Sequence, residues 1–183
     1  MLFDRMIRAA RLDSNLYEEV EHDQNATGQA ATVVAIVAVC QAIGSAVRVL
    51  NAPEAGGPGA AVLGVVLGLV AAFIGWIVWS YVTYWIGTSV FKGVATPGEM
   101  LRTIGFAYTP NVLGILAFIP FVGGLAAFIG SIWALVAGII AIRQGLDLST
   151  GQAVITAIIG WLAVLLLTCL VAAPAALLSG LMA

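Results

Sequence analysis

The chain has 183 residues, of which 62% are hydrophobic and only 9% are charged, and its formal net charge is −2. Soluble domains carry about 25% charged residues, so this composition excludes a water-soluble globular fold and indicates an integral membrane protein. The slightly acidic balance also leaves no basic surface for nucleic acid.

Two short segments precede the first long apolar stretch. At 100° per residue, Leu2, Phe3, Met6, Ile7 and Ala10 share one face of a helix, and the opposite face carries Arg5, Arg8 and Arg11. This pattern predicts a basic amphipathic helix that lies on an anionic membrane surface.

The second short segment predicts a helix that Asp13 or Ser14 caps. It carries an acidic cluster, Glu18, Glu19, Glu21 and Asp23. We expect this cluster to form a solvated helix face, with contact to a partner as the alternative. Together the two helices make residues 1–29 a cytoplasmic amphipathic and acidic N-terminal segment.

The rest of the chain consists of long blocks without charge, and one membrane crossing takes about 20 helical residues. The blocks predict about five spans, at residues 30–50, 60–91, 99–119, 122–142 and 150–173. Pro120 divides the third block into a hairpin of two spans, and Pro174 is expected to kink or end the last helix. The predicted fold is therefore an all-α polytopic transmembrane bundle, with residues 30–183 as its membrane domain.

Two sequences match the capping box that marks a helix start, Thr96-Pro97-Gly98-Glu99 and Ser149-Thr150-Gly151-Gln152.

The distribution of lysine and arginine predicts the orientation of the chain in the membrane. If the chain crosses the membrane five times, the segments on one side of the membrane contain Arg5, Arg8, Arg11, Lys92, Arg102 and Arg143, and the segments on the other side contain Arg48. The positive-inside rule then predicts a cytoplasmic N-terminus and a C-terminus on the opposite side.

The third predicted span contains an unusual sequence, Gly105-Phe106-Ala107-Tyr108-Thr109-Pro110-Asn111. Pro110 cannot donate to the carbonyl of Phe106, so we expect a kink and a new partner for that carbonyl from Tyr108, Thr109 or Asn111. Asn111 is expected to face the bundle interior. These four residues, Tyr108 to Asn111, are candidates for a structural kink or, alternatively, for a substrate or ion site.

Two further patterns mark candidate interaction surfaces. Trp76, Trp79 and Tyr84 suggest either interfacial anchors or an aromatic groove for a lipid or ligand. Small residues at helical spacing include Gly64 and Gly68 in the second span and Gly130 and Gly138 in the fourth. Such residues let helices approach closely, either within the bundle or between membrane proteins.

No predicted span carries an acid, a base or a histidine in its middle. Proton-coupled pumps, intramembrane proteases and metal-dependent enzymes need such groups there, so we predict no catalytic residues, no metal and no cofactor.

The sequence from Gly105 to Pro110, together with Ile132-Trp133 and the stretch Gln144 to Ala153, resembles the Yip1 family over about residues 80–161. The opening, Asp13 to Gly28, resembles its prokaryotic branch. The resemblance implies five helices with a cytoplasmic N-terminus, in a prokaryotic cytoplasmic membrane. Eukaryotic members are associated with Rab-type GTPases and vesicle traffic, but their Asp-Leu-Tyr-Gly-Pro motif is absent here.

We therefore expect a non-catalytic membrane protein that organises membrane or lipids, or serves as a small subunit of a larger complex. Its expected partners are membrane lipids, with other membrane proteins or self-association as further options. The alternative is a small permease or lipid-moving protein that uses a cleft at Tyr108–Asn111.

Overall fold

The computed structural model describes residues 1–51 and 57–181, and these residues form helices and connecting turns without a strand. The helices are α1 (Leu2–Ala10), α2 (Ser14–His22), α3 (Ala26–Leu50), α4 (Gly57–Ser89), α5 (Pro97–Ala107), the 3₁₀ helix η2 (Thr109–Phe118), α6 (Val122–Gly145) and α7 (Thr150–Leu181). The predicted all-α fold is confirmed.

Three described helices, α3, α4 and α6, are long and apolar enough to cross a membrane. Shorter apolar helical stretches lie at Thr109–Phe118 and Thr150–Leu166. These helices support an integral membrane protein. The number of crossings and the sides on which the termini lie stay predictions.

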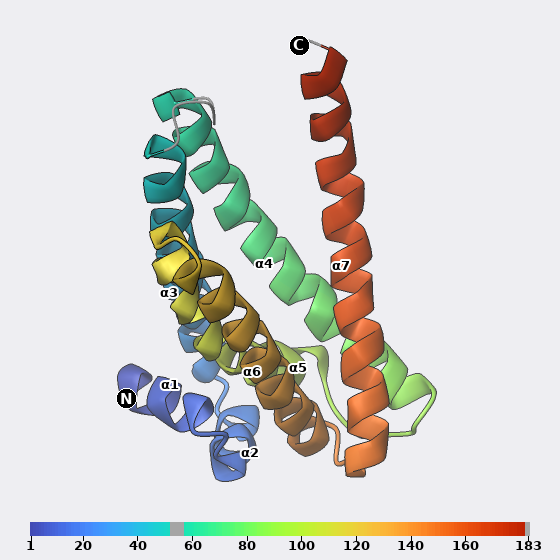
Figure 1. Cartoon of the computed structure of the whole chain (residues 1–183). Coiled ribbons are helices and arrows are strands. Elements are labelled where there is room, and N and C mark those ends of the chain that lie inside the picture. The colour runs from blue at the N-terminus through green and yellow to red at the C-terminus, as the bar shows by residue number, and fades with distance from the viewer. Residues whose placement is uncertain (52–56, 182–183) are drawn as a thin grey trace.

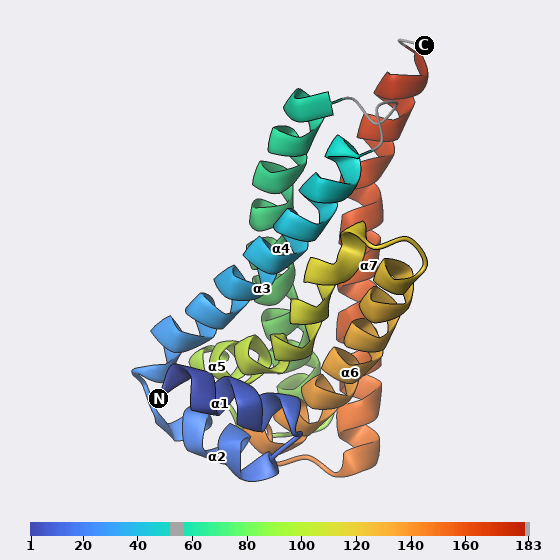
Figure 2. The ribbon, with the colours of Figure 1, turned by 60° about the vertical axis from the view of Figure 1, so that its left-hand side comes forward.

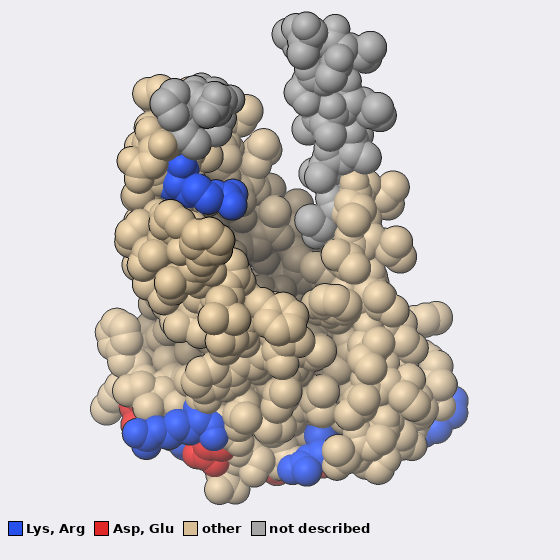
Figure 3. Space-filling model, viewed as in Figure 1, with Lys and Arg blue, Asp and Glu red and all other residues tan. Residues whose placement is uncertain are grey.

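The long helices run side by side, and α1, α2 and α5 lie across one end of the bundle (Figures 1 and 2). At the other end, the tops of α3 and α4 lie close together (Figure 1). Lys, Arg, Asp and Glu gather at the end that holds α1 and α2, apart from one basic group near the top of α3 (Figure 3). Arg48 lies in the last turn of α3.

The third predicted span is not one kinked helix. The α-helix ends at Ala107, and a ten-residue 3₁₀ helix follows from Thr109 to Phe118. Runs of 3₁₀ helix beyond three or four residues are uncommon, and they often mark a hinge or a strained sequence. Pro110 explains the change, because it lacks the N–H that would continue the α-helical ladder.

Both predicted capping boxes are confirmed. The Thr96 hydroxyl accepts from the Glu99 backbone N–H, and the Glu99 carboxylate accepts from the Thr96 N–H at 2.7 Å. Ser149 N–H donates to the Gln152 side-chain oxygen at 3.1 Å, and Gln152 N–H donates to the Ser149 hydroxyl. The last helix continues through Pro174 to Leu181, so Pro174 does not end it.

The most deeply buried side chains lie at the α1–α2 end rather than midway along the long helices. The largest are Leu16 and Tyr17 of α2 with Met100, Ile104 and Phe106 of α5. Asp13 caps α2 by accepting from the Asn15 N–H at 3.0 Å, which fixes the start of this buried helix. The two N-terminal helices are thus part of the folded core.

Candidate functional site

The break between α5 and η2 is satisfied locally. The Thr109 hydroxyl donates to the Phe106 carbonyl at 2.7 Å, which confirms that this carbonyl finds a nearby partner. Tyr108 N–H donates to Gly105 O at 3.3 Å and Asn111 N–H donates to Tyr108 O at 2.9 Å, which is the i to i−3 pattern of a 3₁₀ helix. The backbone therefore turns here without an unsatisfied Phe106 carbonyl.

Asn111 lies half-buried between two cavities. The first, of about 270 Å³, is lined from α3, η2 and α6 by Gln41, Asn111, Gly114, Ala117, Ala127, Gly130 and Ser131. The second, of about 150 Å³, is lined by Trp79, Tyr108, Asn111, Ser131, Ala134, Leu135, Trp161 and Val164. Asn111 and Ser131 belong to both, and the lining residues carry hydroxyl, amide and indole groups but no charge. Such a site suits an uncharged polar group or the polar part of a lipid.

Close helix contact shapes the first cavity. A Cβ added to Gly44 of α3 would collide with the carbonyl oxygens of Gly114 and Ile115, so only glycine lets α3 approach η2 this closely. The Gln41 side-chain amide reaches the Asn111 carbonyl at 3.5 Å, a long contact. Sequence analysis missed both residues, although a glutamine within an apolar span is a visible signal.

The predicted aromatic groove is not open. Trp76 is buried and its indole N–H donates to the Leu101 carbonyl at 3.0 Å. Trp79 is 5% exposed, and its ring packs between Gly138 and Gly160 and lies 5.9 Å from the Tyr108 ring. Tyr84 is half-buried against the core. The three aromatics are mainly packing residues, and of these only Trp79 lines one of the described cavities.

The small residues divide into two kinds. A Cβ at Gly130 would lie 3.2 Å from the Pro110 carbonyl, and one at Gly138 would lie 2.5 Å from the Trp79 ring. These two glycines pack within the bundle. A Cβ added to Gly64 or Gly68 would meet nothing within 4 Å among the described residues, so their role in helix packing stays a prediction. Both glycines are exposed in the described part of the chain.

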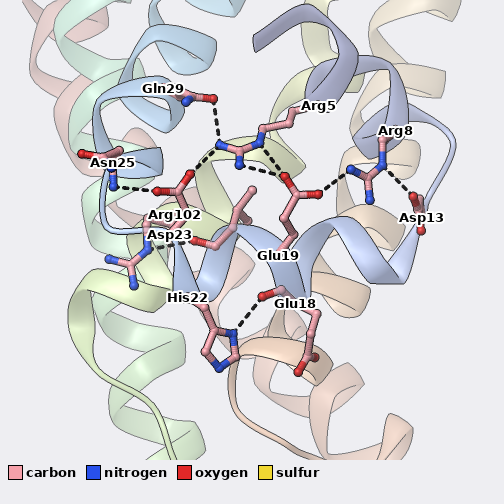
Figure 4. Close-up of polar contacts among 11 residues, drawn as sticks. Arg5, Arg8, Asp13, Glu18, Glu19, His22, Asp23, Asn25, Gln29 and Arg102 are labelled. Carbon is pink, nitrogen blue, oxygen red and sulfur yellow. Dashed lines mark hydrogen bonds and ion pairs between the residues drawn. The ribbon is translucent and has the colours of Figure 1, made fainter. Parts of the chain in front are cut away.

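The charged end contains an ion-pair network that sequence analysis did not foresee (Figure 4). Arg5 of α1 pairs with Glu19 at 2.7 Å and with Asp23 at 2.9 Å. Arg8 pairs with Asp13 at 2.8 Å and with Glu19 at 2.5 Å. The sequence signal for this network is that a short basic helix is followed directly by a short acidic helix. The expectation that Arg5 and Arg8 present their charge to anionic lipid is corrected, because carboxylates of α2 and its cap take both guanidinium groups; Arg11 is exposed.

These pairs shift the acid–base properties of the network. Hydrogen bonds from Arg8 lower the pKa of Asp13 and Glu19, and a hydrogen bond from Arg5 lowers the pKa of Asp23. Glu21 behaves in the opposite way, since burial raises its pKa to about 7. Asp13, Glu19 and Asp23 are thus held in the charged form, whereas burial makes Glu21 easier to protonate than an ordinary glutamate.

Arg102 anchors α2 to α5. Its side chain is 7% exposed and its guanidinium donates to the Val20 carbonyl at 3.0 Å and to the Glu21 carbonyl. These carbonyls belong to the last turn of α2, where the helix itself supplies no donor. A cation at a helix C-terminus is also favoured by the helix dipole.

Among the residues that the structure describes, no three His, Cys, Asp or Glu side chains are grouped so that they could hold a metal ion. The family model described as Yip1 domain matches residues 15–173, which is most of the chain. No curated protein and no solved structure matches this chain.

Proposed function

The chain belongs to the Yip1 family, and from this premise we propose that it is a non-catalytic integral membrane protein that organises membrane lipids or serves as a small subunit of a larger membrane complex. The proposal places it in a prokaryotic cytoplasmic membrane with α1 and α2 in the cytosol. The family's eukaryotic trafficking role is not extended to this chain, because the motif of those members is missing from it.

The observation that carries the proposal is the open surface of α4. In its most apolar window only 17% of the residues are buried, compared with 39% in α6. Val62, Leu63, Val66 and Leu67 are exposed, and a Cβ added to Gly64 or Gly68 beside them would meet nothing within 4 Å among the described residues. A helix surface of this kind contacts lipid, or it receives a partner helix through its small residues.

The chemistry of the two cavities supports a non-catalytic role. Ser131 and Tyr108 contribute hydroxyl groups, but the lining residues include no carboxylate, histidine or lysine that could act as the base to activate a hydroxyl, and no cysteine. Nucleophilic catalysis by a hydroxyl needs such a base beside it.

Extraction into polymer nanodiscs without detergent, followed by native mass spectrometry, tests the proposal. We expect defined adducts of lipid or of a protein partner on the full chain. The double variant Gly64→Leu/Gly68→Leu should lose a protein partner that docks on α4. Gly124→Leu is the matched control, because Gly124 also has nothing within 4 Å of an added Cβ but lies on α6. A lone monomer without lipid or partner would contradict the proposal.

The second candidate is a permease or lipid-moving protein, and the meeting of two cavities at Asn111 and Ser131 favours it. It predicts that Asn111→Leu abolishes flux of a polar solute or of a fluorescent lipid in liposomes. Unchanged flux in the variant, or no flux in the parent protein, removes this candidate.

A further inference from the structure

Helix α1 presents different chemistry on each side. Met6 and Ala9 are buried in the core, and Arg5 and Arg8 point to α2. Phe3 is 71% exposed and Ile7 is 53% exposed. At 100° per residue, this exposed apolar edge lies on the side of α1 away from Arg5 and Arg8. It therefore faces away from α2.

A shallow apolar groove of about 340 Å³ lies where the end of α1 meets α6. Its lining residues are Leu12, Phe128, Ile129, Ile132, Trp133 and Val136. The Trp133 indole N–H donates to the Ala10 carbonyl at 2.8 Å, in the last turn of α1, where carbonyls lack partners within the helix. This bond fixes α1 against α6 and holds the indole in the wall of the groove.

The groove opens on the outer surface of α6, which is a candidate membrane span. Four of its lining residues are exposed there: Phe128, Ile129, Ile132 and Val136. In both ribbon views α1 lies across the end of the bundle, with α2 still farther out (Figures 1 and 2). A tryptophan that is apolar on its body and hydrogen-bonded at its N–H is typical of the membrane–water boundary.

The charged groups near this place do not form an anion site. Arg5 and Arg8 already pair with carboxylates, Arg11 is the one exposed arginine of the three, and in residues 1–29 six carboxylates stand against these three arginines. An anionic headgroup at Arg5 or Arg8 would have to displace these carboxylates and would meet their repulsion.

We propose that the α1–α6 groove binds one acyl chain of a phospholipid, with the α1 edge at Phe3 and Ile7 inserted beside it, and that headgroup charge does not select this lipid. The occupant is a lipid of the leaflet at the α1 end of the bundle. The inference concerns one site and does not depend on the proposed function, since a transporter or a complex subunit could hold the same lipid.

Quenching of Trp133 by brominated lipid tests the proposal on the full chain. The protein is reconstituted in phosphatidylcholine vesicles that contain increasing fractions of dibrominated phosphatidylcholine or dibrominated phosphatidylglycerol. The fluorescence of Trp133 is the difference between the parent protein and Trp133→Phe. Val136→Phe fills the groove, and Ile159→Phe, at an exposed position of α7, is its matched control.

We expect strong quenching of Trp133 by both lipids, with relative affinities within about twofold, and loss of most of this quenching in Val136→Phe but not in Ile159→Phe. If Arg5 and Arg8 bound headgroups, about 1 kcal/mol each would favour the anionic lipid by about 25-fold. A preference of fivefold or more overturns the charge-independent site. An unquenched Trp133, or quenching that Val136→Phe leaves unchanged, overturns the groove itself, and a second copy of the chain would then be the occupant to examine by cross-linking.

Discussion

Arg102 links the end of α2 to α5 of the membrane domain. Arg102→Ala removes the donor for two carbonyls at the end of α2, and each unsatisfied buried carbonyl costs about 1–3 kcal/mol. We expect a lower melting temperature in detergent and faster proteolysis of α1 and α2. Arg143→Ala is the control, because it removes the same charge from a side chain that donates to its neighbour Gln144. Equal melting of the two variants would contradict the anchoring role.

We expect the docking of α2 to depend on pH through Glu21. Burial raises the pKa of Glu21 in the folded chain to about 7, above its ordinary value. The stability that protonated Glu21 contributes is therefore complete below the ordinary pKa and is lost as pH rises through about 7. The charged groups that act on it are His22, Glu18, Glu99 and Asp147.

Hydrogen exchange of α2 measures this dependence. We expect faster exchange-competent opening as pH rises from about 5 to about 8, after correction for the intrinsic rate, and a flatter profile in Glu21→Gln. Asp4→Asn, which removes an exposed carboxylate from α1, should keep the profile of the parent. A profile that Glu21→Gln leaves unchanged would remove Glu21 as the titrating group.

At the scale of elements, glycine positions separate helix packing from open surface. In Gly138→Ala the new Cβ would meet the Trp79 ring, and overpacking of this kind costs about 1–3 kcal/mol. In Gly68→Ala the new Cβ meets nothing within 4 Å, and alanine favours the helix by up to about 1 kcal/mol. We expect the melting temperature to fall in Gly138→Ala and not to fall in Gly68→Ala. The reverse order would contradict the packing of α6 on Trp79.

The elements also show what sequence could predict. Charge-free length and capping boxes located the long helices, because each signal acts within one segment. The break in the third predicted span was only partly predictable. Pro110 indicated that the α-helix is interrupted. Whether an α-helix or a 3₁₀ helix follows depends on contacts with α3, where Gly44 lets the η2 backbone approach closely. The Arg5 and Arg8 pairs and the Gln41–Asn111–Ser131 cavity join distant segments, and spacing within one helix cannot reveal them.

For the whole molecule, the distribution of charge predicts how it lies in the membrane. On the face shown in Figure 3, the charged side chains gather at one end, apart from a basic group near the top of α3, and Arg48 lies in the last turn of that helix. The η2–α6 hairpin ends in a tight turn, where Phe121 has a φ of 63° and is almost fully exposed. If the charged end lies in the cytosol, this turn and the end of α3 reach the opposite side of the membrane.

Cysteine accessibility tests this arrangement most directly. In a Cys40→Ala/Cys169→Ala background, single cysteines replace Asn51, Phe121, Lys92 or Asp147, and intact cells are treated with a membrane-impermeant maleimide. The account predicts labelling of Asn51→Cys and Phe121→Cys in intact cells, and labelling of Lys92→Cys and Asp147→Cys only after permeabilisation. Labelling of Phe121→Cys and Asp147→Cys from the same side would show that the chain between them does not cross the membrane, and would contradict the account.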